Sequence, residues 1–282
     1  MKKNVTDILD IHTHKQEVDT QGKSIINYPL LADSPLYMLL AENVEVTVGR
    51  GSYYSIGIHP WEVRESNVSQ QLSFLQQQLQ RKQFVAVGEA GLDKLAKAPM
   101  ELQLAVFKEQ VKLSEKLGLP LIIHCVKAME ELLGVKKESR PQQPWIWHGF
   151  RGKPEQAVQL LKKGFYLSFG EYYPDETMRI VPDERLFLET DDSLLDIEDI
   201  LCQAARVRGV EVEALREVIR RNIQNVFSIK MRLGWEDPEE CLKLAPIINE
   251  LPLRQVVMHP RLGKQQYKGE VDLKAFEAFQ GV

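Results

Sequence analysis

Short apolar runs alternate with longer amphipathic stretches along most of this chain. The runs lie at residues 8–11, 53–58, 84–87, 121–123, 145–147, 165–169 and 186–188, and helix-like segments lie at 69–81, 102–117, 154–163 and 212–226. This alternation predicts βαβ units and a mainly parallel sheet. The number of runs favours a closed, TIM-barrel-like (β/α) fold, and an open α/β sheet is the alternative. Between residues 15 and 50 the pattern weakens, and we expect a hairpin or irregular excursion around 25–31 and 44–48.

Nearly every apolar run ends in a histidine or an acidic residue. The residues concerned are His12, His14, His59, Glu89, His124, His148 and Asp191. In (β/α) barrels the catalytic groups lie at the carboxyl ends of the strands, where segments far apart in sequence meet. The sequence therefore predicts that these side chains share one cleft. Asp93, four residues after Glu89, is expected to be a loop or capping residue.

Two of these histidines lie two positions apart, which places both imidazoles on the same side of a strand. Imidazoles in such a pair are good ligands for a divalent metal. An isolated pair, or a single histidine, more often lies on a surface or in a core. A carboxylate such as Glu89 directly after a buried strand needs a partner, because an unpaired buried charge is costly. A metal would supply that partner, although a helix cap or a surface acid is the commoner role of a single glutamate.

Taken together, four imidazoles and two carboxylates suit a site for two metal ions about 3.5–4 Å apart, with Glu89 between them. The predicted ligands are His12, His14, Glu89, His124, His148 and Asp191. Such a site makes hydroxide near neutral pH and holds the oxygens of a phosphoryl group. Hydrolysis of a phosphate ester is the expected chemistry, and hydrolysis of an amide or lactone is the alternative.

Composition narrows the classes of protein further. With 36 Lys and Arg against 40 Asp and Glu, the formal net charge is −4, which argues against a strongly basic, nonspecific binder of duplex DNA. Three scattered cysteines exclude a disulfide framework and predict no disulfide-linked partner in a cytoplasmic protein. No apolar run reaches the roughly 18 residues that a membrane helix needs, and no apolar signal region follows the N-terminus.

The order of these motifs resembles that of the TatD-related metal-dependent deoxyribonucleases. The motifs are Asp-Ile-His-Thr-His at 10–14, Gly-Ile-His-Pro at 57–60, Val-Gly-Glu-Ala-Gly-Leu-Asp at 87–93, Pro-Leu-Ile-Ile-His-Cys at 120–125, His-Gly-Phe-Arg-Gly at 148–152 and Leu-Glu-Thr-Asp at 188–191. This resemblance covers residues 1–227 and implies a TIM-barrel-like metallohydrolase that attacks DNA ends.

Matching the motifs assigns roles to individual residues. One metal would take His12, His14, Glu89 and Asp191, and the second would share Glu89 with His124 and His148. His59 matches a family histidine near the substrate phosphate. The family usually has an arginine two residues after the fourth-strand histidine, where this chain has Val126 followed by Lys127. The Tyr-His or Tyr-Arg that often follows Gly-Leu-Asp is also replaced, by Lys-Leu at 94–95.

Residues 228–282 resemble a fragment of a tRNA-dihydrouridine synthase. In that flavoenzyme family two basic strands contact flavin mononucleotide, and Lys230, Arg232, His259 and Arg261 match their positions. Only about two βα units match, and a barrel fragment cannot close its own sheet. We therefore expect 228–282 to be a non-functional appendage without reductase activity.

The leading hypothesis is a hydrolase that cleaves phosphodiester bonds at DNA ends or in small phosphodiesters, with two Mg, Mn or Zn ions. Glu89 and Asp191 are the predicted catalytic residues, and Asp191 is also the candidate proton acceptor. His59, Lys127 and Arg151 are the predicted substrate contacts. The alternatives are a metallohydrolase of another ester or amide, and a degenerate barrel that binds nucleic acid or a partner without catalysis. A flavin-dependent tRNA modifier is disfavoured because the rest of that enzyme has no counterpart here.

Overall fold

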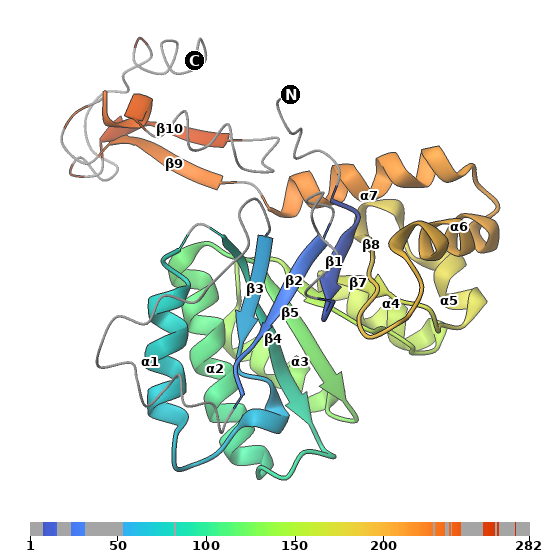
Figure 1. The fold of residues 1–282 in the computed structure, drawn as a ribbon, viewed down its shortest axis with the longest axis horizontal. Coiled ribbons are helices and arrows are strands. Elements are labelled where there is room, and N and C mark those ends of the chain that lie inside the picture. Colours follow the sequence, from blue (N-terminus) through green and yellow to red (C-terminus); the bar gives the residue numbers. More distant parts are fainter. Residues whose placement is uncertain are drawn as a thin grey trace. The chain divides into compact units, whose positions relative to one another are not determined.

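In the computed structural model a ring of parallel strands, enclosed by helices, forms a closed barrel (Figure 1). The structure describes residues 8–15, 24–31, 53–81, 83–227, 229–234, 237, 239–243, 256–262, 264 and 274. The barrel strands are β1 (Asp10–Thr13), β2 (Ser24–Pro29), β3 (Tyr53–Gly57), β4 (Phe84–Asp93), β5 (Leu121–Val126), β6 (Trp145–Trp147), β7 (Phe165–Phe169) and β8 (Leu186–Leu188). The TIM-barrel-like fold expected from the sequence is confirmed.

The helices follow the strands in the order that the sequence predicts. They are α1 (Val68–Gln78), α2 (Met100–Leu117), α3 (Met129–Ser139), α4 (Pro154–Lys162), α5 (Asp175–Ile180), α6 (Ile197–Arg208) and α7 (Val212–Val226), with short 3₁₀ helices η4 (Pro60–Glu62) and η5 (Asp183–Arg185). No helix in the described part of the chain is long and apolar enough to span a membrane. The three cysteines, all among the described residues, carry free thiols.

Each barrel strand pairs in parallel with the strands before and after it in the sequence, and β1 closes the ring by pairing with β8 through Asp10 and Leu188. Because all eight strands run the same way, their carboxyl ends meet at one mouth of the barrel. Strands β5 to β8 are nearly continuous apolar runs because helices cover their outer faces. Among the largest fully buried side chains are Trp145, Phe165, Phe169 and Phe187, all on β6 to β8.

The expected hairpin around residues 25–31 is wrong. Residues 24–29 form β2, which pairs in parallel with both β1 and β3 and is therefore an ordinary barrel strand. A polar Asn27 interrupts its apolar pattern, since its side chain lies inside the mouth rather than in the core. The other part of that expectation, at residues 44–48, lies outside the described residues.

Strand β4 runs six residues past its apolar run, so that Glu89 and Asp93 lie within the strand instead of after it. Glycine permits this extension, because a Cβ atom on Gly91 would overlap the backbone carbonyl oxygen of His124 on β5. Two buried glutamines on α2 hold the neighbouring backbone. Gln110 accepts a hydrogen bond from the Ile58 amide at 2.7 Å and donates to the Ile58 carbonyl at 3.0 Å, and Gln103 bonds the amide and carbonyl of Asp93 in the same way.

From Gln224 onward the described residues belong to a second compact unit, distinct from the unit Ile8–Ile223. In it β9 (Ile229–Gly234) and β10 (Val256–Leu262) form a two-stranded parallel sheet. Lys230 and Arg232 are on β9, and His259 and Arg261 are on β10. The side chains of these four residues lie outside the described part of the structure.

Candidate metal centre

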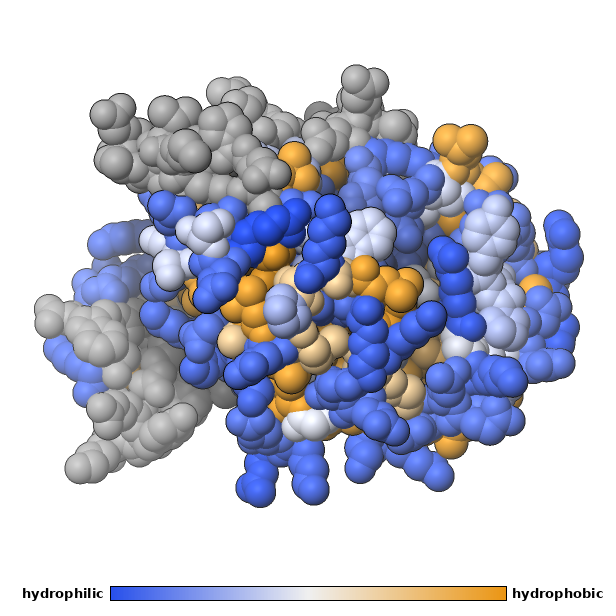
Figure 2. All heavy atoms as spheres, turned by 90° about the horizontal axis from the view of Figure 1, so that it is seen from below, coloured by the Kyte–Doolittle hydropathy of each residue, from blue (hydrophilic) through white to orange (hydrophobic). Residues whose placement is uncertain are grey.

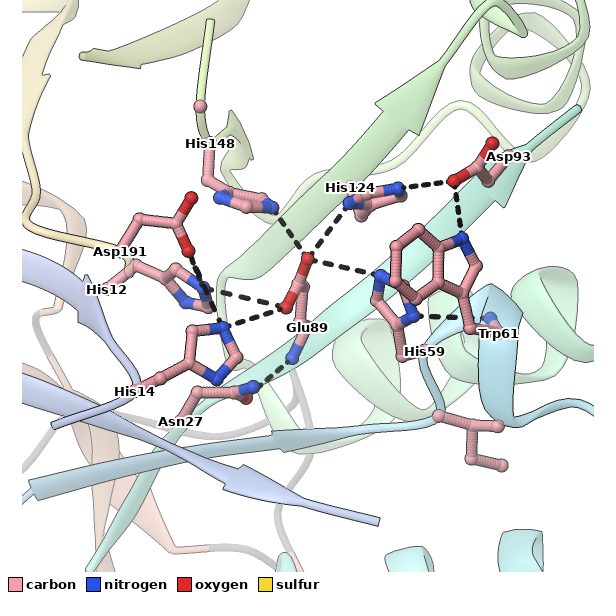
Figure 3. A network of polar contacts seen from close by, with 12 residues as sticks. His12, His14, Asn27, His59, Trp61, Glu89, Asp93, His124, His148 and Asp191 are labelled. Carbon is pink, nitrogen blue, oxygen red and sulfur yellow. Dashed lines mark hydrogen bonds and ion pairs between the residues drawn. The ribbon is translucent and has the colours of Figure 1, made fainter. Parts of the chain in front are cut away.

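Glu89 is the centre of the polar site, and its carboxylate is buried among imidazoles that come from five strands and loops (Figure 3). Its Oε1 atom lies 2.8 Å from His148 Nε2, 3.0 Å from His124 Nδ1 and 3.3 Å from His59 Nε2. Its Oε2 atom lies 3.5 Å from His14 Nε2 and 3.6 Å from His12 Nε2. The two oxygens of one carboxylate therefore face two different sets of histidines.

Asp191 completes the side of the site nearest to β1. Its Oδ1 atom lies 3.5 Å from His14 Nε2 and 3.7 Å from His12 Nε2. The backbone holds it there, because its amide donates to the His12 carbonyl at 2.9 Å and its carbonyl accepts from the His14 amide at 3.3 Å. Asp191 has a φ of 51°, in the left-handed region, which aspartate tolerates better than most residues.

The imidazole of His12 is fully buried, yet neither ring nitrogen has a hydrogen-bond partner among the described residues. Its contacts with Glu89 and Asp191 exceed 3.5 Å, which is too long for a hydrogen bond. A buried polar group without a partner is costly, so the arrangement suits a cation between the ring and the acids. His12, His14 and Glu89 offer ligand atoms within 4.8 Å of one another, and so do His12, His148 and Asp191, and His59, Glu89 and His124.

Acidic residues behind the histidines fix the orientation of the rings. Asp93 Oδ2 lies 3.0 Å from His124 Nε2, which leaves Nδ1 of that ring facing Glu89. Glu189 Oε1 lies 3.4 Å from His148 Nδ1, which leaves Nε2 facing Glu89. Such carboxylate–imidazole pairs select the tautomer and hold the ring of a metal-ligating histidine.

His59 has the opposite arrangement. Its Nδ1 accepts the Trp61 amide hydrogen at 3.2 Å, so its proton lies on Nε2, the nitrogen that faces Glu89. Burial lowers the pKa of His59 despite its contact with Glu89, which favours the neutral ring. His59 therefore presents an N–H donor to the site.

The pKa values of Glu89 and His148 depend strongly on each other. Burial raises the pKa of Glu89, but the surrounding histidines, His148 above all, outweigh it and hold that pKa well below its usual value. Burial likewise lowers the pKa of His148, but Glu89 and Glu189 outweigh it and raise that pKa well above its ordinary range. The site thus keeps its central acid ionised and attracts positive charge, whether protons or metal ions.

The backbone around β1 and β8 is held by Asp10, which accepts hydrogen bonds from the His12 amide at 3.2 Å, the Thr190 amide at 3.1 Å and the Thr190 hydroxyl at 2.8 Å. Burial raises the pKa of Asp10 to about 7. On β2, Asn27 Oδ1 accepts the Glu89 amide hydrogen at 3.0 Å. Asp10 thus joins β1 to the segment after β8, and Asn27 joins β2 to Glu89 on β4.

The site opens into a cavity of about 700 Å³. Figure 2 shows a face of the molecule on which hydrophobic residues gather near the centre and hydrophilic side chains surround them. Trp61, Trp147 and Phe150 contribute apolar lining to the cavity, and the predicted substrate contacts His59, Lys127 and Arg151 line it too. Arg151 is exposed, with its guanidinium carbon 5.7 Å from the Tyr172 ring. Lys127 has a φ of 54° at the end of β5.

The structure brings all six residues predicted as metal ligands together around Glu89. His59, predicted as a substrate contact, lies as near to Glu89 as most of them. Sequence reasoning missed the positioning residues Asp10, Asn27 and Glu189, and Asp93 is a fully buried strand residue rather than the expected loop or cap residue. Glu189 and Asp93 each lie near a strand end, but nothing local in the sequence marks them as partners of a histidine.

Comparison with known proteins adds independent information. The family model described as TatD related DNase matches residues 10–228. The metal-dependent hydrolase YjjV of Escherichia coli is 32% identical over 214 residues, which cover 70% of this chain and 80% of YjjV. The 3′-5′ ssDNA/RNA exonuclease TatD of Pantoea ananatis is 28% identical over 206 residues, 61% of this chain and 76% of that protein.

Solved structures agree on the fold. The crystal structure of E. coli YjjV superposes with a TM-score of 0.63 at 23% sequence identity, covering 79% of this chain and 98% of YjjV. The TatD family hydrolase of Entamoeba histolytica superposes with a TM-score of 0.60 at 17% identity, covering 78% of this chain and 98% of that chain.

Proposed function

Since the chain belongs to the TatD-related DNase family, we propose that it is a metal-dependent phosphodiesterase that cleaves nucleotides from DNA ends. One observation carries the proposal: the two oxygens of Glu89 face separate sets of imidazoles, which is the arrangement that a carboxylate bridging two cations requires. One relative is an exonuclease on single-stranded DNA and RNA by its name, which supports the choice of substrate class.

We assign His12, His14, Asp191 and one oxygen of Glu89 to the first cation. The second would be held by the other oxygen of Glu89 with His124 Nδ1 and His148 Nε2. The number of ions and their identity among Mg, Mn and Zn belong to the proposal, because mixed imidazole and carboxylate ligands suit several metals. A divalent cation supplies Lewis acidity, which polarises the phosphate and makes water easier to deprotonate at neutral pH.

The chain's own residues would do the rest. Asp191 is partly exposed to the cavity, so it can accept the proton of the attacking water. His59 would donate its Nε2 hydrogen to a phosphate oxygen, because its other nitrogen is occupied by the Trp61 amide. Lys127 and Arg151 would balance the charge of the substrate backbone. A lysine is a point charge and cannot form the paired hydrogen bonds of an arginine. Because Val126 stands where the family usually has an arginine, we expect weaker binding of the phosphate there.

The test is metal content together with hydrolysis. We expect purified protein to hold close to two divalent ions per chain, to cleave single-stranded DNA or a small phosphodiester, and to lose activity in EDTA. Glu89→Gln keeps the shape of the side chain but removes its charge, and should reduce the rate at least about 100-fold. Glu155→Gln, an exposed acid on α4, is the matched control and should be unchanged. Most of the activity remaining in Glu89→Gln would contradict the bridging role.

Two other functions remain as outcomes of the same test. Cleavage of esters or amides without cleavage of phosphodiesters would favour a hydrolase with a different substrate. A protein that binds DNA or a partner but has no hydrolytic activity with metal present would favour a degenerate barrel. The observation against the latter is the complete set of candidate ligands.

We further propose that the catalytic domain is 1–227 and that 228–282 takes no part in hydrolysis. The family match ends at residue 228, and the described residues from Gln224 onward form a compact unit of their own. We also propose that this segment resembles a fragment of a dihydrouridine synthase. We expect it to have no reductase activity. Deletion after Phe227 should leave hydrolysis intact. A large loss of activity, or flavin in the purified protein, would contradict it.

A further inference from the structure

Trp61 is exposed and yet held in place by hydrogen bonds. Its side chain is exposed, with 56% of the residue accessible, yet its indole Nε1–H donates a 2.7 Å hydrogen bond to Asp93, whose side chain is buried. The backbone is held as well, because Trp61 lies in η4 and its amide bonds His59 Nδ1. The ring is therefore fixed in one place while much of its apolar surface stays in contact with solvent.

The position of the ring is specific. Trp61 lines the cavity, and its ring meets the imidazoles of His59 and His124 at centroid distances of 5.4 and 6.4 Å, in both cases close to edge-on (Figure 3). Asp93 joins it to His124, since one oxygen of Asp93 contacts both side chains. Trp61 thus lies on the His59–His124 side of Glu89, away from Asp191.

Burying an indole is favourable, and folding leaves much of this one exposed. A ligand that covers the ring would gain that free energy. The other exposed large aromatic residue in the described part of the chain is Tyr172, in the loop after β7 and beside Arg151. In the closed ring β7 lies opposite β3, the strand that precedes Trp61. Exposed aromatic rings, and rings beside an arginine, are surfaces on which unpaired bases stack.

We propose that Trp61 stacks on the unpaired base of the nucleotide whose phosphate enters the site, and that the same side chain holds Asp93 and, through it, the ring of His124. This inference rests on the proposed phosphodiesterase function and adds the group that recognises the base. Stacking does not distinguish one base from another, so the site would accept any single-stranded end and disfavour a paired one.

The test compares two substrates and two variants. The substrates are a single-stranded oligonucleotide and the same oligonucleotide with an abasic residue at each end. Trp61→Ala should raise KM about tenfold on the normal oligonucleotide and change KM little on the abasic one. Trp61→Phe keeps a ring but loses the Asp93 hydrogen bond, so it should restore most of the affinity for the normal oligonucleotide. Any loss in kcat should be common to both variants and both substrates.

Leu95→Ala is the matched control, because Leu95 is exposed two residues after Asp93 but does not line the cavity. It should leave both substrates unaffected. Stacking is overturned if Trp61→Ala raises KM equally on both substrates, or if Trp61→Phe is as impaired as Trp61→Ala. Either result would reduce Trp61 to an anchor for Asp93.

A binding measurement separates this inference from the proposed function. In EDTA, without hydrolysis, the oligonucleotide should quench the fluorescence of the wild type, which has four tryptophans, more than that of Trp61→Phe, which has three. Equal quenching in the two proteins would overturn stacking even if the wild type is an active nuclease. Conversely, if the protein with metal present hydrolyses no phosphodiester, the proposed function is wrong. Fluorescence quenching that depends on Trp61 would even then show that a base binds against its ring.

Discussion

At the residue scale, the orientation of two imidazoles, those of His124 and His148, depends on an acid behind each ring. Asp93 is the clearest case, because its Oδ2 atom meets both His124 Nε2 and the Trp61 indole, and its Oδ1 accepts the Leu95 amide hydrogen. All three partners are donors. An asparagine at position 93 would have one acceptor oxygen and one donor amide group. At least one of the three donors would then lose its acceptor, whichever way the side chain turns.

Asp93→Asn should therefore weaken metal binding while the barrel remains folded. Loss of such an orienting partner typically reduces metal affinity about 10–100-fold. The measurement is a competition titration of the metal-free protein with a chelator of known affinity, and circular dichroism confirms the fold. Asp175→Asn, at an exposed acid paired with Arg179 on α5, is the control. Unchanged affinity in Asp93→Asn would show that His124 needs no orienting partner.

Cys125 follows His124 in the same strand, and its thiol gives a prediction that depends on pH. Burial raises its pKa to about 12, so at pH 8 only about one molecule in 10,000 carries the reactive thiolate. Brief treatment with iodoacetamide should label the exposed Cys202 and leave Cys125 intact, as read by peptide mass spectrometry. The slow labelling of Cys125 should rise about tenfold per pH unit between pH 7 and 9, since the thiolate fraction does. Labelling of Cys125 as fast as that of Cys202 would contradict the raised pKa.

The residues that contact the centre could be predicted from the sequence because each follows an apolar run. His12, Glu89 and His148 each come directly after an apolar run or one residue after it, and such a run is a local property of the sequence. The role of Asp93 or Glu189 depends instead on which histidine lies beside it in three dimensions, on another strand. No local pattern contains that information.

At the scale of elements, strands with an uninterrupted local pattern could be predicted, and a strand whose pattern is interrupted by a functional residue could not. The runs at 145–147, 165–169 and 186–188 coincide with β6, β7 and β8 because their residues, except Ser168, are apolar or aromatic and helices cover them. Strand β2 was missed because Asn27 and Tyr28 interrupt its apolar pattern. Asn27 holds the Glu89 amide instead of packing in the core, so a functional requirement weakened the structural signal.

The close approach of β4 and β5 gives a prediction at this scale. Gly91→Ala would place a methyl group against the carbonyl of His124, so the two strands must separate and the imidazole must move. We expect a loss of about 2 kcal/mol or more in the free energy of unfolding, with weaker metal binding.

Gly134→Ala, in α3, is the matched control for this change. Nothing lies within 4 Å of the Cβ atom that it would add, so the variant should be slightly more stable than the wild type. Urea denaturation of the three proteins provides the comparison. A stable Gly91→Ala protein with normal metal affinity would mean that the strands tolerate a wider spacing.

At the scale of the whole molecule, the centre joins parts of the chain that are distant in sequence, since its candidate ligands come from β1, β4, β5 and the loops after β1, β6 and β8. A cation that binds only the folded barrel must therefore stabilise it. At a free metal concentration 100 times the Kd the gain is about 2.7 kcal/mol. For a barrel of this size that gain corresponds to a rise in Tm of about 5–10 °C.

Differential scanning fluorimetry with and without EDTA measures this stabilisation. Glu89→Gln should show little rise in Tm with metal, whereas Glu155→Gln should behave as the wild type does. An equal rise in the Glu89→Gln protein would place the stabilising ion elsewhere.

The barrel closes only where β1 pairs with β8, and Asp191, the last of the candidate ligands along the chain, bonds the His12 carbonyl and the His14 amide, on either side of Thr13. A nascent polypeptide that has emerged only as far as β7 already carries every histidine of the centre but lacks its final acid and the seam that holds it. Such an unfinished chain, or a proteolytic fragment cut before residue 186, cannot assemble the full set of ligands. Hydrolysis at the centre therefore requires that the eighth strand has been made, because Asp191 directly follows it.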